Sequence, residues 1–79
     1  SIPDEERYAL NQAVATALQN VSDKAREVLL LRFYRECSLE EIATTLAISL
    51  SAAKMRLYRS LEQFRVAYLQ VVGVRRTAA

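Results

Sequence analysis

Apolar residues recur every three or four positions along almost the whole of this 79-residue chain, and one glycine and one proline are all that could interrupt them. That interval is the period of an α-helix with one buried face. Because many tight turns need glycine or proline, few turns can separate the helices. The sequence therefore predicts an all-α fold, a small four-helix domain in which residues 1–79 form a single unit.

Signals for helix ends divide the chain into four segments. Pro3 suits a first helical position, Ser22 and Ser49 suit N-caps, and Ser38 with Glu41 has the pattern of a capping box. Gly73 suits the position after the last helix. We expect helices at about residues 4–20, 23–35, 39–46 and 50–72, followed by a frayed tail at 74–79.

The apolar stripes of these segments identify a candidate core. The segment at 23–35 is apolar on more than one face, which is typical of a central helix. The candidate core residues are Leu10, Val14, Ala17, Leu18 and Val21 in the first segment, Ala25, Val28, Leu29, Leu31 and Phe33 in the second, Leu39, Ile42, Ala43 and Leu46 in the third, and Leu50, Ala53, Leu57, Leu61, Phe64, Tyr68 and Val71 in the fourth.

Composition argues against several classes of function. With no histidine and one cysteine, the chain offers no zinc site, no internal disulfide and no histidine-based catalysis. One glycine does not build a glycine-rich phosphate loop. We expect no catalytic residues, no metal, no cofactor and no small-molecule substrate, and the lack of a nucleophile–base pair argues against an enzyme.

The termini and the apolar runs bear on localisation. The longest purely apolar run, residues 28–31, is far shorter than a membrane span, and the acidic N-terminus does not resemble a signal peptide. We therefore expect a cytoplasmic protein without membrane insertion, in which Cys37 is reduced. Because the first residue is serine, we expect a fragment of a longer protein.

The net charge of +2 conceals an asymmetry along the chain. Residues 1–41 hold five basic and eight acidic side chains, a balance of −3, whereas residues 42–79 hold six basic and one acidic, a balance of +5. A basic second half suggests an anionic partner there. The alternative is a solvated helix surface with no partner.

The third and fourth segments are separated by only three residues, which is the pattern of a helix-turn-helix, here without a wing. Ile48 in the turn is placed to pack between the two helices. At about 100° per residue, Ala53 and Leu57 point inward. The outward face then carries Ser51, Ala52, Met55, Arg56, Tyr58 and Arg59, with Lys54 on its flank.

This outward face suits the major groove of DNA. Small residues near its start allow close approach, arginine or lysine can pair with guanine, and Met55 or Tyr58 can touch thymine methyl groups. The alternative is an amphipathic helix whose polar face is only solvated. Three basic residues within six positions, with no acid before Glu62, favour DNA.

The stretch from Ala17 to about Leu61 resembles region 4 of a bacterial sigma factor of the extracytoplasmic-function (ECF) group. Order and spacing agree over more than half of the chain. The motifs that carry the resemblance are Arg26-Glu27-Val28-Leu29-Leu30-Leu31-Arg32-Phe33, Ser38-Leu39-Glu40-Glu41-Ile42-Ala43, Leu46-Ala47-Ile48-Ser49 and Lys54-Met55-Arg56-Leu57-Tyr58-Arg59.

The resemblance implies a module that binds the −35 promoter element as duplex DNA, docks on the β flap of RNA polymerase and is masked by an anti-sigma factor. By position, the DNA-binding residues would be Ser38, Ser49, Ser51, Ala52, Lys54, Met55, Arg56, Tyr58 and Arg59, and a partner surface would include Phe64, Tyr68, Val71 and Val72. Two alternatives remain: a protein–protein interaction module bound by an anti-sigma factor, and the DNA-binding output domain of another transcriptional regulator.

The sequence departs from the family where glycine is usual, at Ala47 and near Cys37, and Ser51-Ala52-Ala53 replaces a Gly-Thr-Val-like stretch. Ala52 has no hydrogen-bonding side chain, so base contacts there would differ from those of the family. If Ala47 is left-handed, its backbone is strained by roughly 1 kcal/mol. An exchange of Ala47 for glycine is then expected to stabilise the domain.

Overall fold

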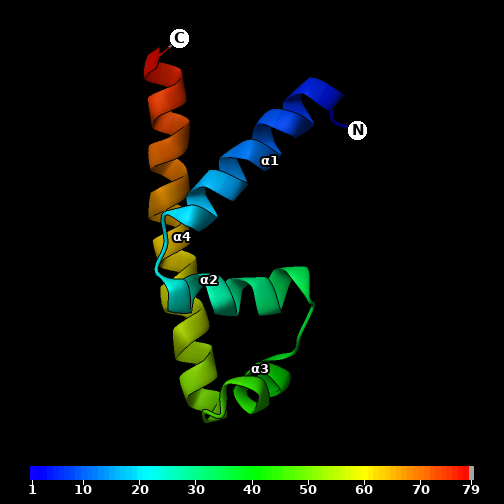
Figure 1. The fold of residues 1–79 in the computed structure, drawn as a ribbon, viewed down its shortest axis with the longest axis vertical. Helices are drawn as coiled ribbons and strands as arrows, with labels where there is room; N and C mark the ends of the chain where they lie inside the picture. The colour runs from blue at the N-terminus through cyan, green and yellow to red at the C-terminus, as the bar shows by residue number, and fades with distance from the viewer. Residues whose placement is uncertain (79) are drawn as a thin grey trace.

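The computed structural model describes the backbone of residues 1–78 and the side chains of residues 1–74. Its elements are α1 (Asp4–Gln19), α2 (Asp23–Leu29), the π-helical segment η1 (Leu30–Tyr34), α3 (Leu39–Leu46) and α4 (Leu50–Ala78). Figure 1 shows α4 as a long rod: α1 diverges from it at an angle, α2 crosses its middle, and α3 lies at its N-terminal end. The described residues contain helices and no strand, which confirms the predicted all-α class.

Hydroxyl caps start three of the helices at the predicted positions. The Ser22 hydroxyl accepts from the backbone N–H of Ala25 at 3.1 Å. The Ser49 hydroxyl accepts from Ala52 at 3.0 Å. At α3 the capping box is complete, because Ser38 Oγ accepts from Glu41 N at 3.1 Å and Ser38 N donates to Glu41 Oε1 at 2.7 Å.

The predicted end of the last helix was wrong. Helix α4 continues through Gly73 to Ala78 rather than ending near residue 72, so residues 74–78 are helical and not a frayed tail; Ala79 lies outside the described residues. Gly73 does not adopt the left-handed conformation that would end a helix. A glycine inside a helix costs only about 1 kcal/mol relative to alanine, which does not by itself stop it.

The second predicted helix also differs, because only its first part is α-helical. From Leu30 on, backbone N–H groups bond to carbonyls more than four residues earlier in the chain, which is the π-helical pattern. Arg35 N donates to Leu30 O and Cys37 N donates to Leu31 O, both at 2.9 Å. Glu36 then takes a positive φ of 57°. Glu36 is the residue before Cys37, and the resembling family usually has a glycine near this position.

Two clusters of buried side chains hold the helices together. Between α1, the start of α2 and the second half of α4 lie Ala17, Val21, Ala25 and Ala67, with Phe64 and Tyr68 packed against them. Between α2, α3 and the start of α4 lie Val28, Ile42, Ala43 and Ala53, with Leu31, Cys37, Leu46 and Ile48 at the margin.

Three candidate core residues are exposed instead. Leu10 is 42% exposed because α1 leaves α4 toward its N-terminus, and Leu50 is 40% exposed at the first position of α4. Phe33 is 61% exposed within η1. The central helix is therefore buried over Ala25, Val28 and Leu29 but not to its end.

Arg26 joins α1 to α2. Its guanidinium donates to the backbone carbonyls of Leu18 at 2.8 Å, Val21 at 3.1 Å and Gln19 at 3.3 Å, and also to Asp23 at 2.9 Å. The last carbonyls of a helix have no partner within it, so this side chain satisfies the end of α1. It also fixes the direction in which α2 departs.

Candidate nucleic-acid interface

The turn of the helix-turn-helix is held by a left-handed residue. Ala47 has φ 56° and ψ 46°, so it adopts the left-handed conformation on which the expected backbone strain depended. Ala47 N donates to Thr44 O at 3.2 Å and Ile48 N donates to Ala43 O at 2.9 Å, the paired bonds of a Schellman motif. Ile48 packs against the cluster around Ile42, as predicted, so the turn fixes how α4 leaves α3.

The first three turns of α4 separate an inward and an outward side. Ala53 is fully buried and Leu57 nearly so, as the periodicity predicts. The outward residues other than Arg56 are exposed, Met55 at 51% and Tyr58 at 69%. The exposed DNA-binding candidates on or just before α4 are Ser49, Ser51, Ala52, Lys54, Met55, Tyr58 and Arg59.

Ser38 and Ser49 both cap helices, and this determines what else they can do. Each hydroxyl oxygen accepts a backbone hydrogen bond at the start of its helix. A serine hydroxyl also has a proton to donate, which capping leaves available. Both side chains can therefore hold a helix start and donate to a phosphate oxygen, although Ser38 is half-buried.

Arg56 and Ser60 lie closer to the core than the other polar residues near the start of α4. Ser60 is 2% exposed, and its hydroxyl donates to the carbonyl of Arg56 at 2.6 Å. Ser60 lies three residues after Leu57 on the inward side, a spacing that could have identified it from sequence. Arg56 is half-buried and faces the start of α2, so it does not point straight outward as predicted.

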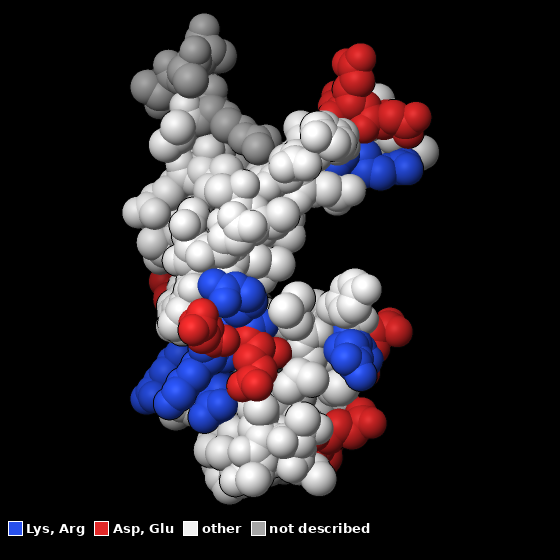
Figure 2. Space-filling view, in the orientation of Figure 1, with Lys and Arg blue, Asp and Glu red and all other residues white. Residues whose placement is uncertain are grey.

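The basic side chains of this surface have no acidic partner within the described residues. Lys54, Arg56 and Arg59 take part in none of the ion pairs there, which join Arg7 to Asp4, Arg26 to Asp23 and Arg65 to Glu62. Figure 2 shows Lys and Arg gathered where α2 meets α4, with acidic side chains beside them, and another acidic group at the free end of α1. The positive charge of this surface is thus available to an anion.

Two carboxylates have shifted pKa values. The Ser38 backbone N–H, followed by its hydroxyl, lowers the pKa of Glu41 below its ordinary 4.5. On α4, the hydrogen bonds and charge of Arg65 lower the pKa of Glu62, and Glu62 in turn raises the pKa of Arg65. Both carboxylates are held in the charged form by structural contacts.

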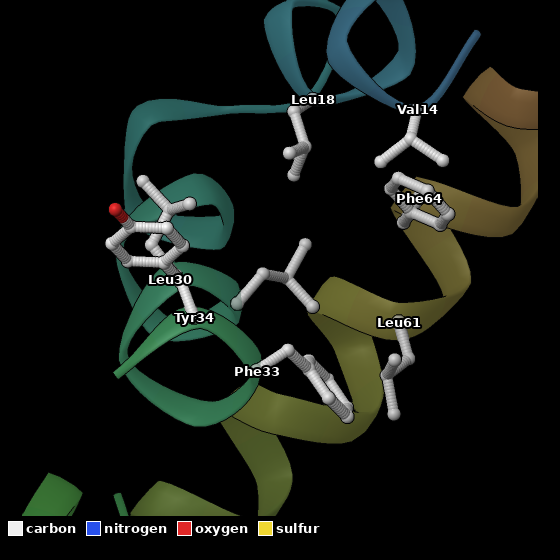
Figure 3. Close-up of a pocket in the computed structure, with 8 residues that line it drawn as sticks. Val14, Leu18, Leu30, Phe33, Tyr34, Leu61 and Phe64 are labelled. Carbon is white, nitrogen blue, oxygen red and sulfur yellow. The ribbon is translucent and has the colours of Figure 1, made fainter. Parts of the chain in front are cut away.

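An apolar groove lies between α1, the end of α2 with η1, and α4. Its volume is about 430 Å³, and Figure 3 shows side chains from the three sides converging on it. Phe33 and Tyr34 at its edge are 61% and 80% exposed. The groove is lined by Val14, Leu18, Leu29, Leu30, Phe33, Tyr34, Leu61 and Phe64.

Only one of the four predicted partner residues lines this groove. Phe64 lines it, whereas Tyr68 stacks on Phe64 with ring centroids 5.9 Å apart and packs on the alanine-rich cluster. Val71 and Val72 are half-buried further along α4. Sequence reasoning missed Leu30, Phe33 and Tyr34 as groove residues. The adjacent aromatics Phe33 and Tyr34 could have signalled it, because neighbours on a helix cannot both face one core.

The described residues offer no support for a metal site or a membrane span. Within residues 1–74, no three His, Cys, Asp or Glu side chains are grouped so that they could hold a metal ion. None of the helices described combines the length and the apolar character needed to cross a membrane.

Comparisons with known proteins agree on one family. The model of sigma-70 region 4 matches residues 17–65. The chain is also similar to the ECF RNA polymerase sigma factor SigL of Mycobacterium tuberculosis, in the Erdman, CDC 1551 and H37Rv strains, at 38% identity over 77 residues. That match covers 96% of this chain and 43% of the relative, so the chain spans less than half the length of the curated relatives that it matches.

Proposed function

The chain belongs to the sigma-70 region 4 family, and we propose that it binds promoter DNA in transcription initiation as part of an alternative sigma factor. The start of α4 would enter the major groove of the −35 element. A single observation carries this proposal: the exposed face of α4 presents Lys54 and Arg59, which have no acidic partner among the described residues, on a helix that a tight turn fixes against α3.

The order of residues on α4 suits a groove-binding helix. Ser51 and Ala52 in the first turn are small and exposed, so the backbone can approach the base edges. Lys54, Met55, Tyr58 and Arg59 then reach outward with longer side chains. An α-helix of 10–12 Å diameter fits a major groove about 12 Å wide. In this arrangement Arg59 reads base edges, and Ser38 and Arg56 contact phosphates.

The apolar groove supports a second role for the same module, which is docking on RNA polymerase. Phe33 and Tyr34 leave large apolar areas exposed beside a concave surface, and such patches mark protein interaction sites. The groove lies between α1, the end of α2 with η1, and the middle of α4, away from the start of α4. DNA and the β flap of the polymerase could therefore be bound at the same time.

Selection from a library of random duplexes, followed by binding measurements on the 79-residue chain, tests the DNA proposal. We expect one sequence family to be enriched. Arg59→Ala should weaken binding to the selected duplex by about five- to a hundredfold, more than to a scrambled duplex, because a bidentate base contact contributes about 1–3 kcal/mol. Equal losses on both duplexes would reject Arg59 as a base-reading residue.

An anti-sigma factor is the second candidate partner. The same groove favours it, because an inhibitor that covers Phe33 and Tyr34 would block access to the polymerase. A competition experiment tests whether the two partners share the groove: core polymerase and an anti-sigma factor selected for binding to the wild-type chain should displace each other from it. Simultaneous binding of both would reject a shared groove.

A further inference from the structure

A second groove, of about 410 Å³, lies between the first turn of α2 and the DNA-facing side of α4. Three cationic side chains line it, Lys24 from α2 with Arg56 and Arg59 from α4. None of its lining residues carries a carboxylate. The family resemblance assigned no role to Lys24, which lies about thirty positions before the basic residues of α4.

The two walls of this basic groove are fixed to each other. Ser22 N donates to the side-chain oxygen of Gln63 at 3.0 Å, which ties the start of α2 to α4 across 41 positions of sequence. Ala25 and Ser60, at 1% and 2% exposure, close the interface beneath the groove. The separation between Lys24 and the two arginines is therefore set by the packing of the helices.

None of the described residues neutralises the three cations of the groove. No ion pair or side-chain hydrogen bond within the described residues involves Lys24, or the guanidinium groups of Arg56 and Arg59. Of the acids close in sequence, Asp23 is bound to Arg26 at 2.9 Å and Glu62 to Arg65 at 2.7 Å. Glu27, one turn further along α2, is exposed and lies outside the lining. Three like charges around one hollow favour an anion there.

The basic groove borders the proposed DNA-binding face directly. Its α4 wall contains Ala52, Met55 and Arg59, which are also outward residues of that face. An α-helix nearly fills the width of a major groove, so the sugar–phosphate backbones run along its flanks. An element that extends one flank of α4 would then lie against a phosphate chain, and the first turn of α2 is such an element.

We propose that the basic groove is a phosphate-binding site, in which Lys24 acts with Arg56 on the DNA backbone that runs beside Arg59 and the base-reading face of α4. This inference rests on the proposed function and extends it to α2. The ligand is the phosphodiester backbone of duplex DNA, because the groove is continuous with the base-reading row. Lys24 neutralises a phosphate and reads no base.

Salt-dependent binding of the 79-residue chain to the selected duplex tests the site. Each neutralised phosphate contributes about 0.9 to the slope of log affinity against log salt. Lys24→Ala should therefore flatten that slope by about one, with the same loss on selected and scrambled duplexes. Arg7→Ala is the matched control, because Arg7 is an exposed cation on α1 and its slope should equal that of the wild type.

Neutral methylphosphonate linkages, placed one at a time along each strand, locate the contact. One linkage at the border of the selected site should weaken binding of the wild type. The same linkage should have no further effect on Lys24→Ala, since the interaction is already lost. Circular dichroism and melting of Lys24→Ala should match the wild type, because Lys24 is exposed and unpaired among the described residues.

The outcomes separate this inference from the proposed function. If Lys24→Ala keeps the wild-type slope while Arg59→Ala weakens binding, the phosphate site is rejected and the DNA-binding function stands. If the wild type binds no duplex at low salt, both are rejected. If Lys24→Ala keeps its DNA affinity but loses binding to a polyglutamate peptide, the groove receives an acidic protein surface instead.

Discussion

The two ends of α4 are packed in different ways. At its start, α2 and α3 close around Val28 and Ile42, branched side chains with no exposed surface. In its second half, α1 packs through a cluster in which three of the four buried residues are alanine. Larger side chains such as Phe64 stay at the margin there. The start of α4 is thus closed around bulky groups, whereas the other end packs through close helix approach and leaves an apolar groove open.

This difference suits the two proposed tasks. A helix that reads base edges must be held in one orientation, which the turn at Ala47 and the branched core around Ile42 provide. A surface that receives a partner needs apolar side chains that the domain itself does not cover, which Phe33 and Tyr34 supply. The comparison can be tested by substitutions at each end.

The largest expected effect is in the closed end. Ile42→Ala should lower the free energy of unfolding by about 2–5 kcal/mol, because it removes a fully buried branched side chain and leaves a cavity. Chemical denaturation monitored by circular dichroism measures the loss. Ile42→Val, with an expected cost of about 0.5–1.5 kcal/mol, keeps the measurement possible if the alanine variant does not fold.

Phe33→Ala is the matched change at the open end. Because Phe33 is 61% exposed, this variant should change the stability by no more than about 0.5 kcal/mol and keep its DNA affinity, but lose binding to RNA polymerase core. A loss of stability comparable to that of Ile42→Ala would contradict the contrast between the two ends.

Arg26 links the two ends, and its removal should have the next largest effect. Arg26→Ala leaves three carbonyls without their charged donor, so we expect a loss of about 2 kcal/mol in the free energy of unfolding. Thermal melting and denaturation measure it. The control is Arg65→Ala, which removes an exposed pair with Glu62 and should cost at most about 1 kcal/mol. Equal losses would show that Arg26 does not join the helices as proposed.

Ala47→Gly should stabilise the closed end by roughly 0.5–1 kcal/mol, because it relieves a left-handed alanine. A rise of several degrees in the melting temperature is expected for a domain of this size, at about 4–8 °C per kcal/mol. Ala15→Gly, at an exposed right-handed position inside α1, should instead destabilise by about 1 kcal/mol. If both substitutions changed the free energy of unfolding in the same direction, Ala47 would not be strained in the folded state.

The smallest expected effect is a pH dependence of the capping box. The folded state lowers the pKa of Glu41, so its stabilisation is present above the ordinary value of 4.5 and is lost as the pH falls through the lowered value. Melting temperatures recorded from neutral pH into this acid range should fall less steeply for Glu41→Gln than for the wild type. Parallel profiles would mean that protonation of Glu41 does not change the stability of the domain.

Much of the fold around the start of α4 could be predicted because its signals are local. The caps at Ser22, Ser38 and Ser49 lie within three residues of the groups that they bind. The inward positions Ala53 and Leu57 follow from helical period alone. Even the strain at Ala47 could be anticipated as a condition, because the resembling family usually has glycine at this position.

The amino-acid sequence by itself determined the helical class, the starts of the helices and the exposed basic face of α4. The tertiary structure decided how far α1 diverges, where the π-helical segment directs Phe33, and that Lys24 lies beside Arg56 and Arg59. It also decided that α4 continues past Gly73. The physical reason is range: caps and periodicity act between neighbours, whereas the bond from Ser22 to Gln63 spans 41 positions and leaves no local pattern.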